Sequence, residues 1–197
     1  MVRAKVEDQR REEILAAFET CVVRKGLLDT TLQDVATEAG LPRSLVRYFM
    51  GNRDDMVGLL IERMVARAES GLLLFQQQRG TLDAPKMVEF LFEAVFADET
   101  SNVVVGELWY LAQRDEETRQ RLKALYARLA QRLTATLGED PAVQAPSKDV
   151  QGVAFSLLSL AYGEASFRTL GMTTVSRARI KEMALRLVST LTHGKDR

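Results

Sequence analysis

The fold is decided by residues 30–60, which read TTLQDVATEAGLPRSLVRYFMGNRDDMVGLL. Thr31 is of a type that caps the N-termini of helices, and Gly40 is of the type that ends them. The stretch therefore predicts one short helix between these two residues. A second short helix is expected over about 42–49, before an interruption that begins at Gly51. Two short helices joined by a glycine turn, behind a longer helix, are typical of a helix-turn-helix.

The second short helix has two different faces. Its apolar residues, spaced by three and four, form an inner face: Pro42, Val46, Phe49 and Met50. Its polar residues form an outer face: Arg43, Ser44, Arg47 and Tyr48. In a helix-turn-helix the second helix enters the major groove, where arginine can bond a guanine edge at two points and serine can bond bases or phosphate. The outer face therefore predicts DNA contact, although a solvated helix surface would carry the same residue types.

Basic and acidic residues balance over the whole chain but not in this segment. The 197 residues include 27 Lys and Arg and 27 Asp and Glu, so the formal net charge is zero. Residues 40–53 contain three arginines and no acid. A chain without net positive charge can bind nucleic acid only through a local basic surface. This segment supplies such a surface.

The counts of cysteine and histidine exclude several classes of site. The chain has one cysteine, Cys21, and one histidine, His193. An internal disulfide, a metal site built from such ligands, and catalytic groups that pair Ser or Cys with His are therefore poorly supported. The sequence predicts no metal, no cofactor and no enzyme. Two alternatives stay open, namely chemistry that uses carboxylates alone and an all-helical adaptor without a role on DNA.

The sequence also points away from membranes. The N-terminal residues are charged and lack the apolar core of a secretory signal. The longest uncharged stretch, 150–163, has 14 residues and is too short to span a bilayer. A cytoplasmic location without a membrane partner is expected.

Apolar residues recur every three or four positions along most of the chain, and strand-like alternation is not convincing anywhere. The sequence therefore predicts an all-α fold of about nine helices. The first is expected to end near residue 25, and the others lie at about 31–39, 42–49, 52–78, 83–97, 101–114, 115–137, 148–170 and 176–192.

Segment 30–60 resembles the DNA-binding domain of the TetR family of transcriptional regulators. The matching elements are Thr30-Thr31, Val35-Ala36, Ala39-Gly40-Leu41, Val46 to Met50, and Gly51-Asn52-Arg53. The resemblance covers about residues 8–62, and residues 109–133 are similar to the C-terminal domains of BetI-like members. Pro42 stands where the family usually has Ser or Thr, and Phe49 stands where it usually has His or Tyr. These two departures indicate fewer phosphate contacts.

The resemblance implies a role on DNA for particular side chains. Thr31 is expected to bond a phosphate where its helix begins. The residues expected to face bases are Arg43, Ser44 and Arg47. Those expected to clamp the DNA backbone are Tyr48, Asn52 and Arg53. Helix capping alone is the alternative for Thr31 and Asn52, and packing is the alternative for Tyr48.

The resemblance also implies a helix-turn-helix domain over 1–52 and a helical effector-binding and dimerisation domain over 53–197. The expected function is that of a ligand-responsive repressor that binds a pseudo-palindromic DNA operator as a homodimer. The sequence does not identify the small-molecule effector. The aromatic and polar residues predicted to bind it are Phe90, Glu107, Trp109, Tyr110, Gln113 and Tyr126. A place in the core is the alternative for each of them.

The helix expected over 148–170 is apolar on two faces, which suits a helix that packs on its own core and on a second subunit. The alternative is a helix buried entirely in the core of its own chain. The residues predicted for the dimer interface, on this helix and the last one, are Ala154, Leu157, Leu158, Ala161, Ala165, Met183 and Leu187. On the same helix, Glu164 is expected to pair with a cationic ligand or with an arginine such as Arg168.

Overall fold

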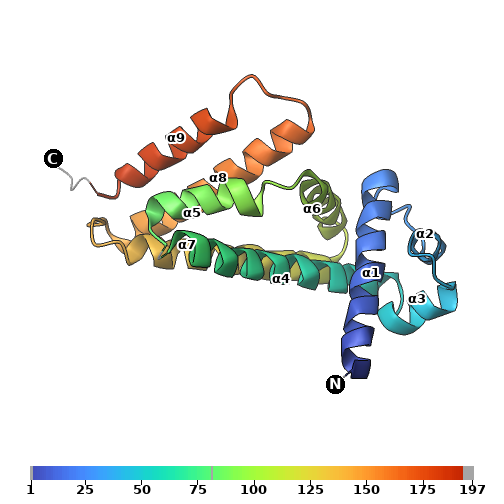
Figure 1. Cartoon of the computed structure of the whole chain (residues 1–197). Helices are drawn as coiled ribbons and strands as arrows, with labels where there is room; N and C mark the ends of the chain where they lie inside the picture. The colour runs from blue at the N-terminus through green and yellow to red at the C-terminus, as the bar shows by residue number, and fades with distance from the viewer. Residues whose placement is uncertain (1, 81, 193–197) are drawn as a thin grey trace. The chain divides into compact units, whose positions relative to one another are not determined.

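The computed structural model describes residues 2–80 and 82–192, with side chains from residue 6 onward; His193 therefore lies outside the described residues. All regular structure in this part of the chain is helical (Figure 1), so the predicted all-α fold of about nine helices is confirmed. The helices are α1 (Val2–Lys25), α2 (Leu32–Glu38), α3 (Arg43–Met50), α4 (Arg53–Arg79), α5 (Ala84–Phe90), α6 (Glu99–Ala112), α7 (Glu116–Gly138), α8 (Ser147–Thr169) and α9 (Arg177–Ser189).

Side-chain caps fix the ends of the short helices. The backbone N–H of Asp34 donates to Thr31 Oγ1 over 3.2 Å, and the N–H of Thr31 donates to Asp34 Oδ2 over 2.9 Å. This reciprocal pair is a capping box. At the start of α4, Asn52 Oδ1 accepts from the N–H groups of Asp54 at 2.7 Å and Asp55 at 3.0 Å. The caps expected from the sequence at Thr31 and Asn52 are confirmed.

Two boundaries differ from the prediction. The helix expected over 83–97 ends as a π-helical segment, Leu91–Val95, in which the Phe96 N–H donates to the Leu91 carbonyl over 3.0 Å. The next helix begins before Ser101, because the carboxylate of Asp98 accepts from the Ser101 N–H over 2.7 Å. Because Asp98 caps the helix, α6 begins at Glu99, two residues before the predicted start.

The helices pack into two compact units. Unit 1 comprises the residues up to Ala66 together with Val103–Lys123, and unit 2 comprises Arg67–Asn102 together with the residues from Ala124. The boundary falls inside α4, α6 and α7. Packing therefore groups the chain differently from the predicted functional division between residues 52 and 53, which stays a prediction.

In unit 1, α2 and α3 pack on α1 (Figure 1), and apolar side chains from all three are buried together. The fully or almost fully buried residues of this helix-turn-helix core include Ile14, Phe18, Val22, Leu27, Val35, Val46 and Met50. The apolar stripe of α1 is thus the platform that holds the two short helices.

In unit 2, helices α5, α8 and α9 and the π-helical segment enclose the main apolar core. The buried side chains from α8 are Val150, Val153, Ala154, Leu157, Leu158, Ala161 and Ala165. Five of these were predicted for a dimer interface, but the structure buries them in the core of their own chain. The three alanines among them let neighbouring helices of the same subunit pack closely. Met183 and Leu187 on α9 are partly buried.

No helix within the described ranges combines the length and the apolar character needed to cross a lipid bilayer.

Candidate nucleic-acid interface

Helix α3 is held by its apolar face and by the turn that precedes it. Val46 and Met50 are buried against the rest of unit 1. Gly40 adopts a φ of 64°, which a side chain would strain, and the Leu41 N–H donates to the Ala36 carbonyl over 2.9 Å. The predicted inner face is confirmed for Val46 and Met50.

The two other residues predicted for that face are placed differently. Phe49 is half-buried. Pro42 is exposed because it is the N-cap of α3 and lies just before the first helical residue, Arg43. Its ring leaves the helix without a side-chain cap. Among the described residues, no side chain accepts a hydrogen bond from the first N–H groups of α3.

The outer face of α3 is open to solvent along its whole length. Arg43, Ser44 and Arg47 are exposed, and the Tyr48 side chain is 74% exposed with its ring edge-on to Phe49 at 5.1 Å. Across the described residues, neither Arg43 nor Arg47 makes a hydrogen bond or ion pair within the chain. Their guanidinium donors are thus available to another molecule.

Two basic residues at the end of α1 behave differently. Arg24 Nη1 lies 2.8 Å from Glu38 Oε2, and Lys25 Nζ lies 2.7 Å from Asp34 Oδ1. The Lys25 ammonium and then the Thr31 hydroxyl hold the pKa of Asp34 below its ordinary value. These two cations are neutralised by acids of α2, whereas Arg43 and Arg47 have no such partner among the described residues.

Arg53 also has a partner inside the chain. Its Nη2 donates to the Leu27 carbonyl over 2.7 Å, and its Nε is buried without a hydrogen-bond partner among the described residues. Thr31 and Asn52 are exposed and act as helix caps. A phosphate contact from any of these three residues stays a prediction.

The residues predicted to bind the effector fall in both units. Phe90 is buried and Tyr126 is partly buried in unit 2, whereas the other four belong to the α6 part of unit 1. There Trp109, Tyr110 and Gln113 are exposed, with Arg114 stacked 4.9 Å from the Tyr110 ring centre. The Glu107 carboxylate accepts from the Leu27 N–H over 2.7 Å.

Sequence reasoning missed an aromatic group in unit 2. The ring centres of Phe96 and Tyr162 lie 6.1 Å apart, and those of Tyr126 and Tyr162 lie 6.3 Å apart, both edge-on. Only Tyr126 was predicted. Tyr162 belongs to α8. Because this helix has apolar residues on two faces, their spacing did not indicate that Tyr162 packs against other aromatic rings.

Glu164 lies on the same helix as Tyr162 and forms a nearly buried ion cluster. Its carboxylate accepts from Arg168 Nε at 2.9 Å and from Arg177 Nε at 3.1 Å, and Arg177 Nη1 also donates to the Phe92 carbonyl at 3.2 Å. Burial alone would raise the pKa of Glu164, but the hydrogen bonds from Arg177 and Arg168 outweigh it and lower that pKa. The expected pairing of Glu164 with Arg168 is confirmed.

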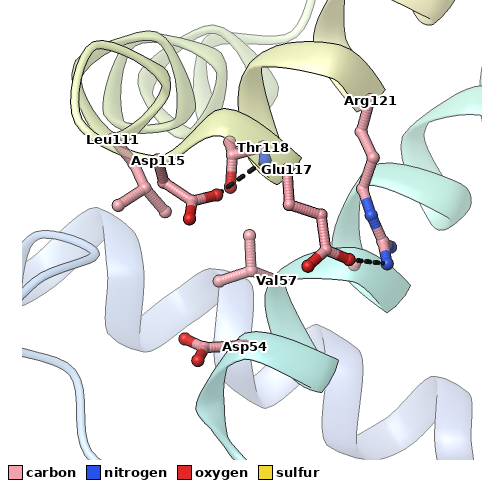
Figure 2. Close-up of a pocket in the computed structure, with 8 residues that line it drawn as sticks. Asp54, Val57, Leu111, Asp115, Glu117, Thr118 and Arg121 are labelled. Carbon is pink, nitrogen blue, oxygen red and sulfur yellow. Dashed lines mark hydrogen bonds and ion pairs between the residues drawn. The ribbon is translucent and has the colours of Figure 1, made fainter.

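Unit 1 also contains a small cavity of about 90 Å³ between α4, α6 and α7 (Figure 2). Its lining residues are Asp54, Val57, Gly58, Leu111, Asp115, Glu117, Thr118 and Arg121. Asp115 caps α7 by accepting from the Thr118 N–H over 2.6 Å, and Glu117 pairs with Arg121 at 2.6 Å. Both interactions are marked in Figure 2. The guanidinium of Arg121 covers Gly58, where a Cβ would meet it at 2.0 Å. No predicted effector residue lines this cavity.

No protein-family model matches the chain. The chain is 29% identical over 142 residues to the HTH-type transcriptional regulator BetI of Agrobacterium fabrum, a match that covers 70% of this chain and 68% of that protein. A TetR-family transcriptional regulator from Rhodococcus sp. shares its fold with a TM-score of 0.77 at 18% identity, over 94% of this chain and 100% of that one. A transcriptional regulator from Saccharomonospora viridis, solved in complex with choline, matches with a TM-score of 0.74 at 15% identity, over 92% and 96%.

The two kinds of likeness agree with each other and with the geometry of α3. The sequence likeness extends over most of the chain, and the fold likeness extends over nearly all of it. In sequence the chain is similar to HTH-type transcriptional regulators, and it has the fold of TetR-family regulators.

Proposed function

We propose that this chain is a ligand-responsive repressor that binds a pseudo-palindromic DNA operator as a homodimer, with α3 in the major groove. The observation that carries the proposal is the contrast between the arginines of α3 and two cations at the end of α1. Arg43 and Arg47 are exposed and unpaired among the described residues, whereas Arg24 and Lys25 are neutralised by acids.

The outer face of α3 has the chemistry for reading base edges. Arg43 and Arg47 are four residues apart, so both project from one side of the helix. Each guanidinium can make two parallel hydrogen bonds to guanine, and the Ser44 hydroxyl between them can bond a base or a phosphate. Because Val46 and Met50 anchor the opposite face, these side chains would enter the groove on a fixed backbone.

The surface that we propose for the dimer is the exposed side of α8. Phe155 is 67% exposed and Phe167 is 55% exposed, although both are large and apolar. On the same helix lie Gly152 and Gly163, where an added Cβ would meet nothing within 4 Å. Small residues near exposed aromatics allow a helix of a second copy to approach closely. This face replaces the core residues predicted from the sequence.

For the effector, we propose an organic cation that contacts the aromatic group of Phe96, Tyr126 and Tyr162. The faces of aromatic rings attract quaternary ammonium groups, and the three rings lie in one cluster within unit 2. The choline bound to the Saccharomonospora viridis regulator is a ligand of this class. Choline titrated into the protein by calorimetry is a direct probe. Binding that is lost in Tyr162→Ala supports this effector class, and no heat of binding contradicts it.

Selection from a random duplex library tests the DNA-binding function and does not require a known operator. The purified full chain is expected to enrich a sequence with two inverted half-sites, and to bind it in the nanomolar range with a steep dependence on salt. Enrichment of no sequence after repeated rounds would contradict the proposal.

A further inference from the structure

We propose that Glu107 and Arg53 are positioning residues for DNA binding, which hold the two peptide groups at Leu27 and thereby fix the turn that leads into α2. The inference rests on the proposed DNA-binding function and adds residues outside the recognition helix to it. It also gives Glu107 a role other than effector binding and Arg53 a role other than phosphate contact.

Glu107 reaches this turn from α6, which lies 80 residues away along the chain. Its Oε2 accepts from the Leu27 N–H over 2.7 Å. The preceding residue, Gly26, has a φ of 83°, and a Cβ there would lie 3.4 Å from the same oxygen. A glycine therefore gives both the turn and the space that the carboxylate occupies.

Arg53 binds the second backbone group of Leu27, its carbonyl. It is the first residue of α4, and its Nη2 donates to the Leu27 carbonyl over 2.7 Å. The Leu27 side chain is fully buried, so its backbone groups depend on partners from the protein. An acceptor from α6 and a donor from α4 satisfy them. Hydrogen bonds of this kind, with one ionised partner, are about twice as strong as neutral ones.

The turn leads directly into the helix-turn-helix. The hydroxyl of Thr30 donates to the Gly26 carbonyl over 2.7 Å, and Thr31 is the N-cap of α2. Helix α3 packs on α2 and α1, so a displacement of the turn is passed on to α3. The position of the recognition helix thus depends on a side chain of α6, a helix that lies outside the helix-turn-helix.

The two roles of Glu107 lead to different expectations. If its carboxylate bound only an effector, its removal would leave DNA binding without effector unchanged. If it positions the turn, removal of the acceptor weakens DNA binding even when no effector is present. The two roles of Arg53 differ in salt dependence. Loss of a phosphate contact lowers the salt slope by about one, whereas loss of a positioning bond weakens binding without changing that slope.

The experiment is a fluorescence anisotropy titration of the full chain with the duplex from the library selection, over a salt series and without effector. Glu107→Ala is expected to weaken binding about tenfold, which corresponds to loss of one charge-assisted hydrogen bond. Glu107→Gln is expected to bind almost as well as the wild type, because its amide oxygen can still accept from Leu27. Glu62→Ala removes the same charge from an exposed position on α4 and is the matched control.

Arg53→Ala is expected to weaken binding to a similar extent with an unchanged salt slope. Circular dichroism of each variant shows whether the helices are intact. If Glu107→Ala does not fold, Glu107→Met takes its place, because it removes the acceptor and keeps most of the side-chain volume.

Three results would overturn the proposal or a part of it. Wild-type affinity in the folded Glu107→Ala or Glu107→Met variant would show that the bond does not position the turn. Equal losses in Glu107→Ala and Glu107→Gln would assign the effect to charge. A salt slope lowered by one in Arg53→Ala would assign that residue to a phosphate. If the wild type itself selects no duplex, the proposed function fails instead, so the two failures are distinguishable.

Discussion

Helices α3 and α8 each have one buried and one exposed face, but the exposed faces differ in kind. Val46 and Met50 anchor α3, and its outer side carries unpaired arginines. The inner side of α8 is buried in the core of unit 2, and its outer side carries Phe155 and Phe167. Exposed cations without partners suit a polyanion, whereas exposed aromatics suit another apolar surface. One chain therefore presents two surfaces for two kinds of partner.

The largest effect is expected from charges placed on the outer side of α8. Burial of one phenylalanine contributes roughly 1.5–3 kcal/mol, so Phe155→Glu with Phe167→Glu should weaken dimerisation at least about a hundredfold. Sedimentation velocity measures this directly. Leu73→Glu, at an exposed leucine of α4, is the control and should leave the dimer intact. A double variant that sediments like the wild type would show that this face is not the interface.

The next largest effect is expected on the buried side of the same helix. Leu157 is completely buried, so Leu157→Ala should lower the free energy of unfolding by about 2–5 kcal/mol through lost contacts and the cavity left behind. Urea denaturation followed by circular dichroism measures the change. Leu73→Ala should cost less than about 0.5 kcal/mol. Similar costs for the two variants would contradict the assignment of the faces of α8.

On α3, Arg47→Ala should weaken binding to the selected duplex by about 1–3 kcal/mol and relax the preference at one base pair. The affinity is measured by anisotropy on the selected duplex and on its single-base variants. Arg128→Ala removes an exposed arginine of α7 and should change neither quantity. Full selectivity in the Arg47 variant would exclude a base contact at this position.

A smaller effect is expected just after α3, where Asn52 caps α4. Asn52→Ala should cost about 1 kcal/mol of unfolding free energy, because the N–H groups of Asp54 and Asp55 lose their acceptor. Asn52→Asp keeps an acceptor and should recover most of the loss, as measured by thermal denaturation. Unchanged stability in the alanine variant would rule out the capping role.

The smallest effect is expected on the pH dependence of stability, through Glu164 of α8. Hydrogen bonds from Arg177 and Arg168 lower the pKa of Glu164 in the folded protein. Its contribution to stability is therefore complete above the ordinary glutamate pKa of about 4.3 and is lost as the pH falls through the lower folded value. The pH dependence of unfolding below this point should be weaker in Glu164→Gln and unchanged in Glu62→Gln. An identical pH profile in all three proteins would refute this linkage.

The sequence was most informative where local interactions decide the structure. The capping box at Thr31, the turn at Gly40 and the cap at Asn52 each depend on residues within a few positions of one another, and all three are present. The polar and apolar sides of α3 also follow from spacing alone, apart from Pro42, which lies at the helix end, and Phe49, which is only half-buried.

Contacts between distant segments could not be predicted in this way. Apolar residues on two sides of α8 left its buried face undetermined, and the structure places Ala154 and Leu157 on that buried face. The partner of Glu107 lies 80 residues away, and that of Arg53 lies 26 residues away. Composition gives no sign of either bond, because it is the packing of α4 and α6 on the turn that creates them.

The account depends most on the claim that the outer face of α3 reads DNA sequence. Its most direct test compares the wild type with the double variant Arg43→Ala and Arg47→Ala by anisotropy, on the selected duplex and a scrambled one. The account predicts that the wild type prefers the selected duplex by about a thousandfold or more and that the double variant binds both duplexes with similar, weak affinity. A double variant that keeps the wild-type preference would contradict it.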